Sequence, residues 1–92
     1  MDEVERLFVI RIRDPLTRGR VRGRLGDMGA NAVTDNIWEL PKQQVDDPAD
    51  DAQWWDEQLG WFENVIDKRT DVIYIWTSTG AGMVRTVVGG GE

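Results

Sequence analysis

The chain has no cysteine and no histidine, and these two absences exclude several kinds of catalytic site. Without cysteine there is no disulfide, no thiolate nucleophile and no zinc–thiolate centre. Without histidine there is no Ser-His-Asp triad, no imidazole general base and no histidine metal ligand. The groups left for chemistry are carboxylates, hydroxyls and arginines, together with a hard cation such as Mg²⁺ held by oxygen ligands.

Long apolar runs are also missing. No run approaches the roughly 18 apolar residues that indicate a membrane-spanning helix, and the acidic N-terminus, Met-Asp-Glu-Val-Glu, is not typical of a secretory signal peptide. We therefore expect a cytoplasmic protein with no membrane partner. Ninety-two residues predict a single domain, 1–92, near the lower size limit for one hydrophobic core, so oligomerisation would help it.

Charge is distributed unevenly along the chain. The net charge is −6, but residues 1–24 contain seven of the eleven basic side chains and sum to +3. An acidic protein repels phosphate on average, so the basic segment requires its own explanation. Its basic residues are Arg6, Arg11, Arg13, Arg18, Arg20, Arg22 and Arg24.

The N-terminal segment predicts a strand followed by a helix. Over Val4 to Arg13, apolar residues alternate, which is typical of a strand with two different faces. Asp14-Pro15 then predicts a capped helix start, because proline at the first helical position loses no hydrogen bond. The helix is expected over 15–28, with Gly29 as its C-terminal cap.

The rest of the chain predicts two further strands, a helix and a closing hairpin strand. The second helix carries an apolar stripe at helical spacing that includes three tryptophans, which favours burial in the core over stacking on nucleic-acid bases. The expected segments are a strand over 30–40 ended by Pro41, an acidic loop over 42–51, a helix over 51–68, strands over 71–77 and 83–88, and a flexible tail over 89–92.

The acidic loop has two interpretations. Asp46, Asp47, Asp50 and Asp51 surround Pro48. Aspartate favours the positive end of a helix dipole, and Asp50-x-x-Gln53 resembles a capping box, so the cluster fits a helix start. A metal site is the alternative, but the glycine and terminal glutamate of a calcium loop are missing.

This order of elements predicts an α+β two-layer sandwich of the ferredoxin-like kind, an antiparallel sheet with two helices on one face. Because no helix covers the other face, its large apolar side chains are expected to form an interface. We therefore predict a homodimer built on the open face of the sheet or on its edge strands.

Three segments resemble one known family. Asp14-Pro15-Leu16-Thr17-Arg18-Gly19-Arg20-Val21, Asn31–Leu40 (NAVTDNIWEL) and the closing hairpin DVIYIWTSTGAGMVRTVVGG resemble the small spacer-acquisition subunit of CRISPR systems, the Cas-two family. The resemblance implies a symmetric ferredoxin-like dimer that binds duplex DNA or RNA and scaffolds an integrase subunit in antiviral defence. It also implies a possible metal-dependent nuclease, with Asp14 as the catalytic residue and Mg²⁺ ligand, and phosphate contacts from Arg18 and Arg20.

Each candidate residue also has a structural interpretation. Asp14 can cap the first helix instead of binding Mg²⁺. Arg11, Arg13, Arg18 and Arg20 can bind nucleic-acid phosphates or simply form a solvated surface. Two other function classes stay open: an acidic binding module or inhibitor that uses residues 46–67 against a basic protein partner, and an antitoxin-type endoribonuclease of the same fold.

Overall fold

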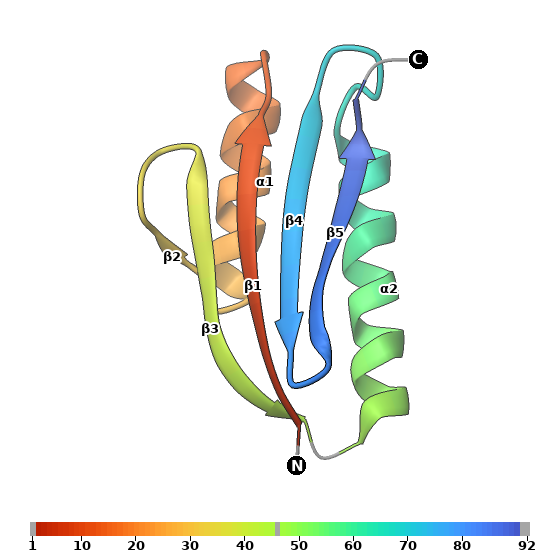
Figure 1. Ribbon diagram of the computed structural model, residues 1–92. Helices are drawn as coiled ribbons and strands as arrows, with labels where there is room; N and C mark the ends of the chain where they lie inside the picture. Colours follow the sequence, from red (N-terminus) through yellow and green to blue (C-terminus); the bar gives the residue numbers. More distant parts are fainter. Residues whose placement is uncertain (1, 46, 91–92) are drawn as a thin grey trace.

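The computed structural model describes residues 2–45 and 47–90. They form a five-stranded sheet in the order β2-β3-β1-β4-β5, in which every neighbouring pair is antiparallel. Both helices lie behind this sheet in Figure 1 and leave its other face open, so the predicted α+β two-layer arrangement is confirmed. The elements are β1 (Asp2–Arg11), α1 (Pro15–Asp27), β2 (Asn31–Ala32), β3 (Ile37–Val45), α2 (Pro48–Val65), β4 (Val72–Thr79) and β5 (Gly82–Gly89).

The hydrophobic core fills the layer between the sheet and the helices. Phe8 and Ile10 of β1 are fully buried against it, as their alternation predicts. The Phe8 ring contacts the rings of Trp55 and Phe62 from α2, with centroids 6.0 and 6.3 Å apart. Trp54, Trp55 and Trp61 pack against the core, so the sequence-based assignment of these tryptophans to the core is confirmed.

Helix α1 begins and ends at the predicted signals. The Asp14 carboxylate accepts hydrogen bonds from the backbone N–H of Thr17 at 2.8 Å and from its hydroxyl at 2.9 Å. At the other end Gly29 has a φ of +94°, which favours glycine. Its N–H donates to the Gly26 carbonyl, and the Ala30 N–H donates to the Leu25 carbonyl. These two bonds form the glycine-terminated cap that the sequence predicts.

The single strand predicted over 30–40 is instead two strands joined by a turn. The Thr34 hydroxyl accepts hydrogen bonds from the N–H groups of Asn36 and Ile37, which closes the turn between β2 and β3. The prediction that Pro41 ends the strand was wrong, because β3 continues to Val45. The register between β3 and β1 shifts by one residue beside Pro41, and such a bulge is one of the few places where a strand tolerates proline.

The predicted acidic loop over 42–51 is mostly regular structure. Residues 42–45 belong to β3, and α2 begins at Pro48 with Asp47 as its cap, accepting from the Ala49 N–H at 3.0 Å. The helix-start interpretation was therefore correct, but the cap is Asp47 and not Asp50, and the helix ends at Val65 instead of 68. Asp46 lies outside the described residues.

The closing hairpin is confirmed, with β4 and β5 paired over their full lengths around a turn at Gly80 and Ala81. The flexible tail predicted over 89–92 starts too early, because Gly89 ends β5 and the Gly90 N–H donates to the Asp71 carbonyl at 3.0 Å. Gly89 has a φ of +79°, and a Cβ there would clash with the Asp71 carbonyl oxygen, so this contact requires glycine. Residues 91–92 lie outside the described part of the chain.

Candidate nucleic-acid interface

Three of the seven arginines in the basic segment are occupied by contacts within the protein. Arg6 is 4% exposed, and its guanidinium lies 3.6 Å from the Asp51 carboxylate. The Arg22 guanidinium contacts the Asp35 carboxylate at 3.4 Å. Arg24 donates from Nε to Gln58 Oε1 at 2.9 Å and lies over the Trp61 ring. These three arginines support the fold and are poor candidates for a phosphate-binding surface.

The four predicted nucleic-acid-binding arginines do not form one continuous ridge. Arg11 is the last residue of β1 and, paired with Val72, lies on the open face of the sheet. Arg13 lies beyond the end of β1, so the two do not share a strand face. Arg18 lies one helical turn before Arg22, on the side of α1 that faces Asp35. Arg20 lies one helical turn before Arg24, on the side of α1 that faces α2.

A buried carboxylate connects the end of β1 to a distant turn. Asp71 is 2% exposed and precedes β4. It accepts hydrogen bonds from the Arg13 N–H and the Asp67 N–H, both at 3.1 Å, and from the Thr70 hydroxyl at 3.2 Å. These bonds hold the turn that follows α2 beside the start of α1, at one end of the molecule (Figure 1).

This turn adds two cations that the sequence analysis did not identify. Lys68 and Arg69 are both exposed, and their turn is fixed by an Arg69 N–H bond to the Asp67 carboxylate at 3.0 Å. Together with Arg13 and Arg18 they form what we term the basic end (Arg13, Arg18, Lys68 and Arg69). Arginine supplies a planar fork of donors that suits phosphate oxygens, and lysine supplies a mobile point charge.

The carboxylates at the basic end accept hydrogen bonds from local groups. Asp14 accepts from Thr17, Asp67 accepts from the Arg69 N–H, and Asp71 accepts from three donors. Among the side chains that the structure describes, none of these three acids forms an ion pair with an arginine or lysine of the basic end. The four cations therefore stay available to an anionic ligand.

Asp14, the predicted catalytic and Mg²⁺-binding residue, is exposed and acts as the cap of α1. The hydrogen bonds from Thr17 hold the pKa of its carboxyl below the usual range, and Arg18 and Arg20 lower this pKa further. Within residues 2–45 and 47–90, no group of three or more acidic side chains is placed to hold a metal ion. One carboxylate engaged in capping does not by itself fit an Mg²⁺ centre, which needs several oxygen ligands, so we derive no metal-dependent step from it.

The Asp14 cap stabilises the folded protein to an extent that depends on pH. Because folding lowers the Asp14 pKa, the cap stabilises the protein above the unfolded-state pKa, and this stabilisation is lost as pH falls through the folded-state value. We expect Asp14→Ala to lower the melting temperature by a few degrees at pH 7, with the difference disappearing under strongly acidic conditions. Asp14→Asn keeps a good capping group without the charge, so its melting temperature should fall less than that of Asp14→Ala. Thermal unfolding by circular dichroism across pH 2–7 would check this; an equal loss at every pH would contradict it.

No helix in the described part of the chain is long and apolar enough to cross a membrane. Comparisons with known protein families, with curated proteins and with solved structures find no match for this chain.

Proposed function

We propose that this protein is a homodimeric scaffold that binds duplex nucleic acid through its basic end, of the kind found in the Cas-two family of CRISPR spacer acquisition. The observation that supports this most is the Asp71 carboxylate, which holds the Lys68–Arg69 turn beside Arg13 and the start of α1. Cations from the β1–α1 junction and from the turn after α2 are thereby held at one end of a molecule whose net charge is −6.

The order of the elements supports the family part of the proposal. From β1 to β4 the chain runs β-α-β-β-α-β, and these four strands lie in the sheet order β4-β1-β3-β2. We take this to be the split βαβ arrangement of ferredoxin-like folds, extended at one edge by β5. The fold alone does not identify a function, so the proposal depends on the basic end and on the sequence resemblance.

The basic end is suited to gripping phosphates without reading bases. Arg13, Lys68 and Arg69 are exposed, and Arg18 is partly exposed. Contacts from such cations to phosphates position a duplex but carry no direct sequence information. With three to four such contacts, the logarithm of the association constant should fall with the logarithm of the salt concentration with a slope of about −3. The remaining acidic surface repels the duplex elsewhere and so favours binding at this end.

Fluorescence anisotropy with a short labelled duplex tests the proposal. Between about 50 and about 200 mM salt, affinity should fall roughly 50- to 150-fold. The double variant Lys68→Ala/Arg69→Ala should weaken binding and reduce the salt slope by about two. Arg22→Ala is the matched control, since it removes a positive charge that is already bound to Asp35. No binding at low salt, or equal losses in the control, would overturn the proposal.

Helix α2 favours a second candidate function. It contains five acidic residues and no lysine or arginine, and its exposed acids are Asp50, Asp56, Glu57 and Glu63. This surface would suit a basic protein partner, as an acidic binding module would use it. This second function gains support if the anisotropy experiment shows no duplex binding. Charge-neutral substitutions at Asp56 and Glu57 would then test whether the acidic surface binds a basic protein partner.

A further inference from the structure

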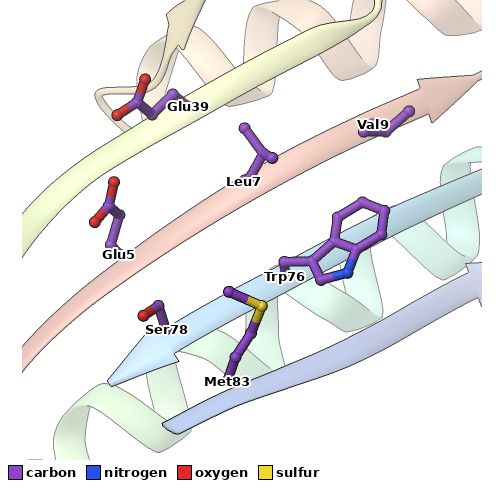
Figure 2. Close-up of a pocket in the computed structure, with 7 residues that line it drawn as sticks. All are labelled: Glu5, Leu7, Val9, Glu39, Trp76, Ser78 and Met83. Carbon is purple, nitrogen blue, oxygen red and sulfur yellow. The ribbon is translucent and has the colours of Figure 1, made fainter. Parts of the chain in front are cut away.

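The open face of the sheet contains an apolar hollow. Figure 2 shows this hollow, whose volume is about 500 Å³, and small-molecule sites in proteins occupy roughly 300–1,000 Å³. Its walls include Leu7 and Val9 of β1, Trp76 of β4 and Met83 of β5. Both helices lie on the other face of the sheet (Figure 1), so the hollow is open to solvent.

Two carboxylates lie together on one side of the hollow. Glu5 and Glu39 come from neighbouring strands, and both line the hollow (Figure 2). Glu39 pairs with Leu7, so Glu5, two residues before Leu7, is its diagonal neighbour at about 7 Å. Neither carboxylate forms an ion pair with a side chain that the structure describes. Because like charges at this distance repel each other, this side of the hollow attracts a cation.

Trp76 adds a second group that binds cations. The face of an indole ring attracts a positive charge, and the Trp76 ring is partly exposed and stacks with Tyr74 at 6.1 Å between centroids. Among the described residues, no arginine or lysine lies over the Trp76 ring, and none lines the hollow. The hollow therefore combines two carboxylates, a free aromatic ring and apolar walls.

We propose that this hollow binds a small organic monocation, in which an ammonium group is attached to an aromatic or alkyl body. The ammonium group lies between Glu5 and Glu39, and the body packs against Leu7, Trp76 and Met83. This site goes beyond the proposed function and does not depend on it, because it contains no residue of the basic end.

Two arginines on the same face limit the ligand to one positive charge. Arg85 of β5 pairs with Trp76 and lies in the same row across the sheet as Glu39. Three strand spacings separate the backbones of Arg85 and Glu39 by about 14 Å, which exceeds the screening length of about 8 Å at physiological salt. Arg11 lies about 20 Å along β1 from Glu5. These arginines leave the attraction of the acidic pair intact, but they repel a polyamine or basic peptide that extends along the face.

A titration with phenethylammonium, followed by nuclear magnetic resonance of the isotope-labelled native protein, tests the site. The chain has five tryptophans, and the indole N–H signal of Trp76 is identified by its loss in Trp76→Phe. We expect a saturable shift of this signal. The signals of the other tryptophans should move little, because those side chains pack against the core. Phenethyl alcohol, which keeps the ring and lacks the charge, should bind about tenfold more weakly.

Charge removal tests the acidic pair. Glu5→Gln/Glu39→Gln keeps the size of both side chains and should weaken phenethylammonium binding about tenfold. Glu57→Gln/Glu63→Gln is the matched control, because it removes the same charge from exposed positions on α2, in the other layer of the fold. Circular dichroism would verify that both variants are folded. The control should bind as the native chain does.

Three results would overturn the proposal: no saturable shift of the Trp76 signal, equal affinity for the alcohol, or an equal loss in the control. The first of these is also the result expected if a second copy of the chain covers the hollow. None of them bears on duplex binding at the basic end, which the anisotropy experiment measures separately.

Discussion

Replacing Asp51 by alanine should lower the free energy of unfolding by about 3 kcal/mol, a large part of the roughly 5–15 kcal/mol typical of a small domain. Asp51 lies in the first turn of α2, and its carboxylate is 3.6 Å from the Arg6 guanidinium. Arg6 is 4% exposed, and its Nε is buried without a hydrogen-bond partner among the described groups. Burial lowers the pKa of Arg6 while Asp51 raises it, and the guanidinium stays charged at neutral pH. Without Asp51 this charge would be buried and uncompensated.

The aromatic residues around Arg6 predict a different result for a variant that removes the charge. The guanidinium carbon lies 4.0 Å from the centre of the Trp55 ring and 5.9 Å from that of Trp54. Methionine keeps an unbranched apolar stem and packs well against aromatic rings, and it has no charge to desolvate. We therefore expect Arg6→Met to change the free energy of unfolding by less than about 1.5 kcal/mol.

A double-mutant cycle separates the buried charge from the packing. Arg6→Met/Asp51→Ala should be more stable than Asp51→Ala alone by about 2 kcal/mol, because the uncompensated charge is gone. Urea denaturation followed by tryptophan fluorescence would measure all four proteins. If the losses of unfolding free energy in the two single variants simply add in the double variant, this account is contradicted, and Asp51 acts through helix α2 alone.

The parts of the fold that the sequence predicts depend on local signals. Asp14-Pro15 and Gly29 determine both ends of α1 through contacts within a few residues. The position of Arg6 could also have been predicted, because the alternation of β1 places it on the core side with Phe8. Sequence analysis listed Arg6 only as one of the seven basic residues of this segment. Charged residues are rarely buried without a partner, and the partner of Arg6, Asp51, lies 45 residues away.

The errors arise where tertiary contacts override local signals. Pro41 usually ends a strand, but pairing with β1 and the adjacent bulge extend β3 to Val45. The basic end depends on a hydrogen bond between Arg13 and Asp71, which are 58 residues apart, and no local pattern indicates that contact. Sequence analysis therefore predicted an interface from four arginines of one segment and had no signal for Lys68 and Arg69, whose turn lies beside Arg13.

The homodimer of the proposed function predicts a step in duplex affinity as the duplex lengthens. Each protomer contributes one basic end, and the longest dimension of the protomer is 39 Å. At about 3.4 Å per base pair this length corresponds to roughly 12 base pairs. We expect a duplex of about 8 base pairs to reach one basic end and a duplex of about 20 base pairs to reach both.

Binding at two linked sites should exceed binding at one by at least tenfold, because the second contact is intramolecular. Anisotropy measurements over duplexes of about 8 to 20 base pairs should therefore show a steep rise beyond about 12 for the native chain. The Lys68→Ala/Arg69→Ala variant weakens each basic end, so it should show only the gradual increase that comes from additional overlapping sites. A gradual curve for the native chain would reject the two-ended dimer, while duplex binding by the basic end would stand.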